Sequence, residues 1–269
     1  MPTVGNLSYL EAAPRPSTDS ARAVERAGRT LLLLHAFPLS AKMWEPQLAL
    51  ADEGWRVIAP DFASSSTTPR PTMDDYAGRV IDLLDSLRLH DAVIAGLSMG
   101  GYVAFAMFRH APRYVQGLIL SDTRAEADTP QAVESRQKMQ ALLDEKGQIA
   151  IADDMIPKLL GETTRETMPA IVERVRALVL ASSRESISGA LNALMTRPDC
   201  TSLLSSIHCP TLVVVGEEDT VTPRPLSEKM QQAIPGAELA VIPRAGHLSS
   251  FEQPVLFNQT LARFLAHRV

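Results

Sequence analysis

Three short motifs supply a candidate nucleophile, acid and base, in that order along the chain. Ser98 stands in a G-x-S-x-G pentapeptide, Asp219 ends a Gly-Glu-Glu-Asp stretch, and His247 follows Gly246. A serine hydroxyl is a weak nucleophile by itself. It becomes reactive when a histidine accepts its proton and a carboxylate orients that histidine. The sequence therefore predicts nucleophilic catalysis by Ser98, with His247 as base and Asp219 as the orienting acid.

The surroundings of Ser98 fit such a role. An apolar run, 92–95, precedes the pentapeptide, and a helix-like segment, 101–107, follows it. Flanking glycines let the backbone turn sharply between a strand and a helix, which holds the serine in a strained conformation at the turn. His247 has a comparable setting, on a loop after the last predicted strand. Four other histidines lie near element ends without such a context: His90, His110, His208 and His267.

The acid has a second candidate. Asp122 also follows a predicted strand and could reach a histidine at the same sheet edge, and Glu217 and Glu218 are near neighbours of Asp219. Asp219 is favoured because its Asp-x-x-x-Pro turn and following helix are typical of a triad acid loop. We expect Asp122 to cap the next segment or to line the cavity floor.

A serine nucleophile also needs two backbone N–H donors for the oxyanion that forms on its substrate. The residue after the nucleophile, Met99, supplies one. Phe37, on the loop that ends an early strand, is expected to supply the other. His35 is interpreted as a structural residue that bonds the backbone of this loop.

Apolar runs and helical patterns alternate along most of the chain, which predicts a mainly parallel sheet covered by helices on both faces. Residues 12–30 are polar and contain two prolines, so we expect an irregular segment there. Thr72 should cap a helix. Strands are expected at 7–13, Thr30–His35, Arg56–Asp61, Ala92–Gly96, Val115–Ser121, Thr211–Gly216 and Glu238–Ile242, and helices at Met43–Asp52, Met73–Leu87, Gly100–His110, Arg224–Ile234 and Phe251–His267.

Residues 125–197 interrupt this alternation with helix formers alone, which predicts an insertion of four helices. Its inward positions are aliphatic or Met, so we expect an apolar roof over the site and no catalytic group. Met139, Leu178 and, next to the base, Leu248 are predicted to line the substrate pocket.

The composition excludes several function classes. A chain of 269 residues with 45% apolar and 21% charged residues is an ordinary globular protein, and its net charge of −5 argues against a nucleic-acid surface. The apolar runs are strand-sized, which predicts no membrane span, and the first residues lack a secretory signal, which predicts a cytoplasmic location. Cys200 and Cys209 are expected to be buried or half-buried free thiols.

Over almost its whole length, the chain resembles the α/β-hydrolase superfamily, and it looks most like the branch of carboxylesterases, lactonases and cofactor-free haloperoxidases (perhydrolases). The matching stretches are His35–Ser40 with Met43-Trp44, Gly96–Gly101, Gly216–Asp219 and Gly246-His247. The resemblance implies an α/β fold with a core domain at 1–124 and 198–269, and a helical cap at 125–197 inserted between strands six and seven.

Two loops depart from that family pattern. Relatives usually carry Gly where Ala36 stands, so the oxyanion loop is expected to have a slightly different shape. Relatives also read Asp-x-Arg-Gly-His-Gly-x-Ser where this chain has 61–68, with serines at 64–66.

The residues and the resemblance together predict a serine hydrolase that cleaves small carboxylic esters through an acyl-enzyme, without metal or organic cofactor. The alternatives are a lactonase, a perhydrolase/haloperoxidase that uses peroxide in place of water, and a non-hydrolytic receptor on the same fold. The expected partner is a small ester or lactone, with no nucleic acid and no membrane, and the chain is expected to be a monomer or homodimer.

Overall fold

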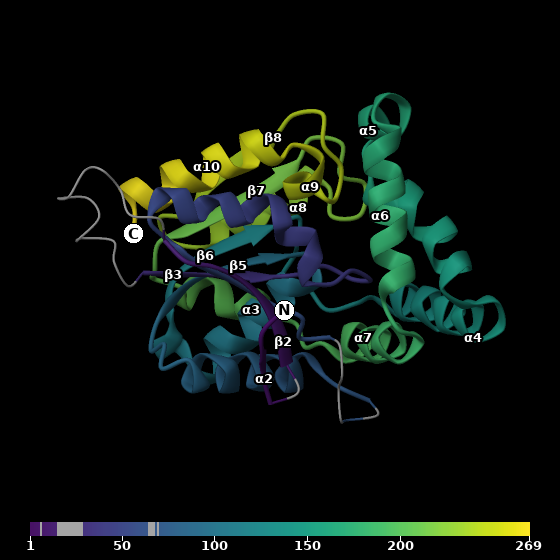
Figure 1. Ribbon diagram of the computed structural model, residues 1–269, viewed down its shortest axis with the longest axis horizontal. Coiled ribbons are helices and arrows are strands. Elements are labelled where there is room, and N and C mark those ends of the chain that lie inside the picture. Colours follow the sequence, from purple (N-terminus) through teal and green to yellow (C-terminus); the bar gives the residue numbers. More distant parts are fainter. Residues whose placement is uncertain (6, 15–28, 64–67, 69) are drawn as a thin grey trace.

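An eight-stranded sheet forms the centre of the protein (Figure 1). The computed structural model describes residues 1–5, 7–14, 29–63, 68 and 70–269. The strand order is β1-β2-β4-β3-β5-β6-β7-β8; β1 and β2 run antiparallel to their neighbours, and the other strands are parallel to one another. The strands are β1 (Thr3–Val4), β2 (Leu7–Ala12), β3 (Thr30–Leu34), β4 (Arg56–Pro60), β5 (Ala92–Leu97), β6 (Val115–Ser121), β7 (Thr211–Gly216) and β8 (Glu238–Ile242).

Helices cover both faces of this sheet, as the apolar strands require. On one face η1 (Ala41–Glu53) packs against α10 (Pro254–His267), and on the other α2 (Met73–Ser86) packs against α3 (Met99–His110) (Figure 1). Helix α8 (Arg224–Ala233) contacts β7 and β8. The short helices are η2 (Pro112–Tyr114), η3 (Thr201–Ser206) and α9 (Ser249–Glu252). The mainly parallel α/β fold predicted from the sequence is confirmed.

Most differences from the predicted elements have local causes. Strand β1 was not predicted, because two residues carry no pattern. The helix expected at 43–52 is a 3₁₀ helix that contains Pro46, whose missing N–H cannot donate in an α-helix. The helix expected at 251–267 is broken before Pro254, because a proline disfavours helical angles in the preceding residue. Thr72 caps α2 as predicted, in a reciprocal capping box with Asp75.

A helical region lies between β6 and β7, as predicted. It consists of α4 (Pro130–Leu159), α5 (Glu162–Thr167), α6 (Pro169–Ala181) and α7 (Arg184–Thr196), and we call residues 130–196 the helical insertion. Gly147, at φ 71° and ψ −166°, divides α4 into two helical halves. In Figure 1 the four helices gather beyond one end of the sheet. A buried ion pair between Asp128 Oδ1 and Arg197 Nη1, 2.6 Å apart, joins the segments just before and just after the insertion.

Other sequence predictions have simpler outcomes. Cys200 is a buried free thiol and Cys209 a half-buried one, as expected. No helix in the described ranges is long and apolar enough to cross a membrane. The irregular segment expected near the N-terminus falls mainly on residues 15–28, and the serine-rich loop on 64–67, so both lie outside the described residues.

Candidate active site

Ser98 occupies the turn between β5 and α3 with φ 53° and ψ −112°. A non-glycine residue in such a conformation costs on the order of 1–3 kcal/mol. Hydrogen bonds on both sides of the residue hold it there: its N–H donates to the carbonyl of Ser121 at 2.9 Å, and its own carbonyl accepts from Gly101 N–H and Thr123 Oγ1, each at 2.9 Å. The turn is therefore fixed by β6 and by the start of α3.

The glycines of the pentapeptide permit close backbone approach. A Cβ on Gly100 would lie 2.0 Å from the carbonyl oxygen of Leu34 in β3, and a Cβ on Gly96 would lie 2.3 Å from the carbonyl oxygen of Gly100. Side chains at these two positions would push α3 away from the sheet. The G-x-S-x-G pattern therefore has glycines at Gly96 and Gly100 because the turn packs too tightly against β3 and α3 to leave room for a side chain.

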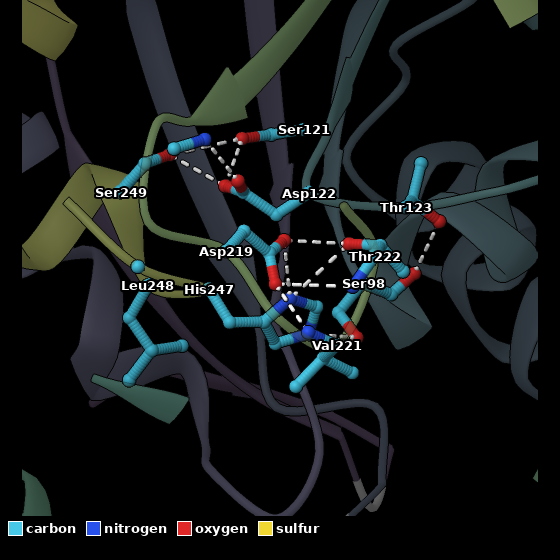
Figure 2. A network of polar contacts seen from close by, with 12 residues as sticks. Ser98, Ser121, Asp122, Thr123, Asp219, Val221, Thr222, His247, Leu248 and Ser249 are labelled. Carbon is cyan, nitrogen blue, oxygen red and sulfur yellow. Dashed lines mark hydrogen bonds and ion pairs between the residues drawn. The ribbon is translucent and has the colours of Figure 1, made fainter. Parts of the chain in front are cut away.

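The structure brings Ser98, His247 and Asp219 together (Figure 2). The Nε2 atom of His247 lies 2.8 Å from Ser98 Oγ, and its Nδ1 atom lies 2.8 Å from Asp219 Oδ2. An N–H at Nδ1 donates to the carboxylate, which leaves Nε2 as an acceptor for the serine hydroxyl. The arrangement can take a proton from Ser98 and hold the resulting charge on the imidazole.

Asp219 is fixed by its own loop after β7. Its Oδ1 accepts from the N–H groups of Val221 and Thr222 at 2.8 and 3.0 Å, and its Oδ2 accepts from Thr222 Oγ1 at 2.6 Å. Burial alone would raise the pKa of this carboxyl, but the charge of His247 and these hydrogen bonds hold it at about 2. Asp219 therefore remains ionised beside the imidazole.

His247 is buried, with 2% of its surface exposed. Burial pushes its pKa down, but the charge and hydrogen bond of Asp219, with the charges of Asp122 and Glu252, outweigh that effect and leave the pKa above its ordinary value. The negative groups around the imidazole thus favour its protonated form.

Asp122, the other candidate acid, is directed elsewhere. Its Oδ1 accepts from Gly216 N–H at 2.7 Å, and its Oδ2 accepts from Ser121 Oγ at 2.8 Å and Ser249 Oγ at 2.5 Å (Figure 2). Burial, followed by the charge of Asp219, raises the pKa of Asp122 to about 7. This carboxyl ties the ends of β6 and β7 to α9.

The predicted oxyanion donors lie on adjacent segments. Strands β3 and β5 are paired with Leu34 opposite Gly96, so the loop after β3 runs beside the turn at Ser98. Phe37 and Met99 line one narrow crevice together with residues of α7. The assignment of their N–H groups as oxyanion donors stays a prediction.

The loop after β3 does not need a glycine at position 36. The non-glycine residues with positive φ in the described chain are Arg88, Ser98, Asp122 and Arg244, so the φ of Ala36 is not positive. His35 donates from Nδ1 to the carbonyl of Ala36 at 3.1 Å and stacks on Phe62, in keeping with a structural role.

The predicted pocket residues lie in different settings. Met139 lines an open groove of about 430 Å³ between the two halves of α4, and Val221, two residues after Asp219, forms the wall of this groove on the core side. Leu178 is half-buried on α6, outside the lining of that groove. Leu248 is fully buried next to His247.

Two functional candidates were missed by sequence reasoning. Thr222 bonds Asp219 and lies 3.3 Å from His247 Nδ1 through its hydroxyl, and Glu252 is a buried carboxylate near the base. The turn after Asp219 offered a signal for Thr222, because Asp side chains commonly bond backbone N–H groups two and three residues ahead. Glu252 had no comparable signal.

Comparison with known proteins finds relatives that match most of the length of the chain. The family model described as "Alpha/beta hydrolase family" matches residues 31–260. A thermophilic esterase from Thermogutta terrifontis, solved with malate bound, has 37% sequence identity and a TM-score of 0.88, with 97% of this chain and 93% of that chain covered.

Two curated relatives are more distant in sequence. The 3-oxoadipate enol-lactonase 2 of Acinetobacter baylyi is 29% identical over 235 residues, which is 86% of each chain. The carboxylesterase YbfK of Bacillus subtilis is 27% identical over 246 residues, covering 88% of this chain and 80% of the relative.

Proposed function

Because the chain belongs to the alpha/beta hydrolase family, we propose that it is a serine hydrolase that cleaves small carboxylic esters through an acyl-enzyme on Ser98. The observation that carries this proposal is the unbroken chain of contacts from Ser98 Oγ through His247 to Asp219, with 2.8 Å at each step. The esterase at 37% identity supports an ester as substrate.

The reaction follows from the positions of these groups. Ser98 Oγ attacks the ester carbonyl carbon while His247 Nε2 takes its proton, and the N–H groups of Phe37 and Met99 stabilise the tetrahedral oxyanion. His247 then gives the proton to the departing alcohol, which leaves the acyl group on Ser98. Water, deprotonated by His247, attacks that acyl group and releases the acid.

The carboxylate of Asp219 has a defined part in both halves of this cycle. It holds the imidazole in the tautomer with Nδ1 protonated, so Nε2 faces the serine as an acceptor. It also stabilises the imidazolium that forms at each attack. A pKa of about 2 keeps Asp219 charged throughout.

We assign the helical insertion the part of a cap that selects substrates. It contributes apolar residues such as Met139, Leu142 and Met155 to the groove beside Val221, while the groups that perform the chemistry belong to loops of the sheet. Apolar contacts discriminate by size, at about 1–3 kcal/mol per methylene.

A lactone is the second candidate substrate. A lactone is an internal ester, so attack by Ser98 opens the ring and leaves the alcohol tethered to the acyl group. The enol-lactonase at 29% identity favours this reading.

The test combines a covalent probe with a substrate panel. A fluorophosphonate should label the wild type at Ser98, and p-nitrophenyl esters of graded acyl length should be hydrolysed with multiple turnovers. Ser98→Ala should lose labelling and several orders of magnitude of kcat with an unchanged fold, while Ser206→Ala, in η3, serves as a matched control. More than about a tenth of wild-type activity in Ser98→Ala would refute the nucleophile. Parallel assays with lactones decide between the two substrate classes.

A further inference from the structure

Glu252 is a buried carboxylate that accepts hydrogen bonds from three backbone N–H groups. Its Oε1 accepts from Gly246 at 2.8 Å and from Leu248 at 3.3 Å, and its Oε2 accepts from Gly161 at 2.8 Å. The side chain is 2% exposed. Gly246 and Leu248 flank His247, so one carboxylate holds the peptide groups on both sides of the proposed base.

The third donor, Gly161, belongs to the helical insertion, in the turn between α4 and α5. This turn packs directly on the base loop: Leu248 N–H also lies 3.1 Å from the carbonyl of Leu159, and a Cβ on Gly246 would lie 2.2 Å from Gly161 N. Glu252 therefore bridges two segments, the loop that carries His247 and the turn at 159–161.

The acid loop holds the same turn from its other side. Glu218, next to Asp219, accepts from Thr163 N–H at 2.9 Å and from Thr163 Oγ1 at 2.5 Å. Its own N–H donates to the carbonyl of Ala245 at 2.8 Å. The base loop, the acid loop and the insertion turn thus form one hydrogen-bonded unit, with Glu252 at the contact nearest to the base.

We propose that Glu252 is a positioning residue, which fixes the loop around His247 against the insertion so that the imidazole keeps its contacts with Ser98 and Asp219. The inference rests on the proposed function, since it assigns His247 the part of base. A carboxylate suits this place because it offers two acceptor oxygens and no donor, whereas an amide would turn an NH₂ group toward one of the N–H groups. Misplacement of a catalytic group by about 1 Å can cost about a hundredfold in rate.

The charge of Glu252 makes the proposed role measurable in the pH dependence of kcat/KM. The negative groups that act on His247 come from three elements: Asp219 on the acid loop, Asp122 at the end of β6, and Glu252 on α9. Each favours the imidazolium and raises the pKa of His247. Loss of the charge at 252 should therefore move the acidic limb of the kcat/KM profile to lower pH, because the base is then neutral over a wider range.

The experiment compares Glu252→Gln and Glu252→Asp with a control in η1, the helix that packs against α9. Gln47 donates from Nε2 to the carbonyl of Ser250 at 2.9 Å, so Gln47→Met loosens α9 without removing a charge. Glu252→Gln should lower kcat and fluorophosphonate labelling by tenfold or more, with the acidic limb moved to lower pH. Glu252→Asp keeps the charge but lacks the reach, so its kcat should fall while the limb stays in place. Gln47→Met should lower Tm with the limb unmoved.

The outcomes separate this inference from the proposed function. A wild type that neither reacts with the probe nor turns over esters refutes the function. An active wild type whose Glu252→Gln variant keeps its kcat, or keeps its acidic limb, refutes the positioning role alone. If neither variant folds, amide hydrogen exchange in the wild type decides: Gly161 and Gly246 should be protected to the same degree, and rapid exchange at either amide overturns the inference.

Discussion

Asp122 and Asp219 follow neighbouring strands, β6 and β7, and their carboxylates face different partners. Asp219 bonds the imidazole of His247 at 2.8 Å, whereas Asp122 is bonded by Ser121, Ser249 and the N–H of Gly216. The pKa of Asp219 is held at about 2 and that of Asp122 is raised to about 7. Two interacting buried carboxylates resist double ionisation, and the contacts with His247 and Thr222 decide that Asp219 ionises at the lower pH.

This difference predicts unequal effects of neutralising the two acids. Asp219→Asn should lower kcat by several orders of magnitude, because the amide favours the wrong imidazole tautomer. Asp122→Asn should keep kcat within about tenfold, since an amide oxygen can still accept from Gly216 and serine hydroxyls can reorient. Steady-state kinetics on one activated ester measures both. If Asp122→Asn is the more damaging change, the acid follows β6 and the proposed assignment is wrong.

The pH dependence follows from the raised pKa of His247. The base must be neutral to accept the proton of Ser98, so kcat/KM should rise with pH through that pKa, and the acidic limb should lie above the ordinary imidazole value of 6.5. Asp122→Asn removes one of the charges that raise this pKa, which should shift the limb to lower pH. A pH–rate profile of the wild type with a limb below the ordinary imidazole value would contradict the electrostatic account.

Thr222 should matter through its hydroxyl. Thr222→Val preserves shape but removes the donor that lies 2.6 Å from Asp219 Oδ2, so the pKa of Asp219 should rise and its orientation should loosen. A hydrogen bond to a charged group contributes about 1.5–3 kcal/mol, which corresponds to a loss of roughly tenfold or more in kcat. Thr220→Val, at an exposed position of the same loop, is the control and should retain wild-type kinetics. If Thr222→Val has the same kinetics as Thr220→Val, the Thr222 hydroxyl has no part in the reaction.

Chain-length preference should respond to the groove along α4. Met139→Ala widens this groove, so the optimum in an ester series should move toward longer chains while the rate of fluorophosphonate labelling stays near that of the wild type. Leu180→Ala, at a side chain 40% exposed on α6, is the comparison variant. An unchanged length profile, or loss of labelling in folded Met139→Ala, would show that the groove does not determine the preferred chain length.

The elements that position the site were predictable because their signals are local. Buried parallel strands are apolar runs, and the turn at Ser98 carries glycines wherever a Cβ would strike the backbone. The predicted order of Ser98, Asp219 and His247 leads to residues that do lie in contact. Their separation along the chain did not hinder this, because each of the three follows a strand of one sheet.

Side chains that bridge distant segments were not predictable in this way. Glu252 and its partner Gly161 are 91 positions apart, and neither has a neighbour pattern that reveals the contact. In sequence, Glu252 resembles any acidic residue near the start of a surface helix. Its burial becomes visible when the insertion turn is placed over the base loop. The groove was not predictable for the same reason, since Val221 and Met139 are far apart in the sequence and line it together in the folded chain.

The attachment of the helical insertion has a consequence for how this protein can diverge. At the turn after α4, Glu252 and Glu218 bind the N–H groups of Gly161 and Thr163, which every residue except proline possesses. Hydrogen bonds to backbone N–H groups depend on the position of the main chain and hardly at all on which side chains the insertion carries. Gly161 and Thr163 are the exceptions, because a Cβ on Gly161 would lie 2.4 Å from Glu218 Oε2, and the hydroxyl of Thr163 also donates to Glu218. With these two residues retained, the other side chains of the insertion can change while its docking to the loops that carry Asp219 and His247 is inherited unchanged.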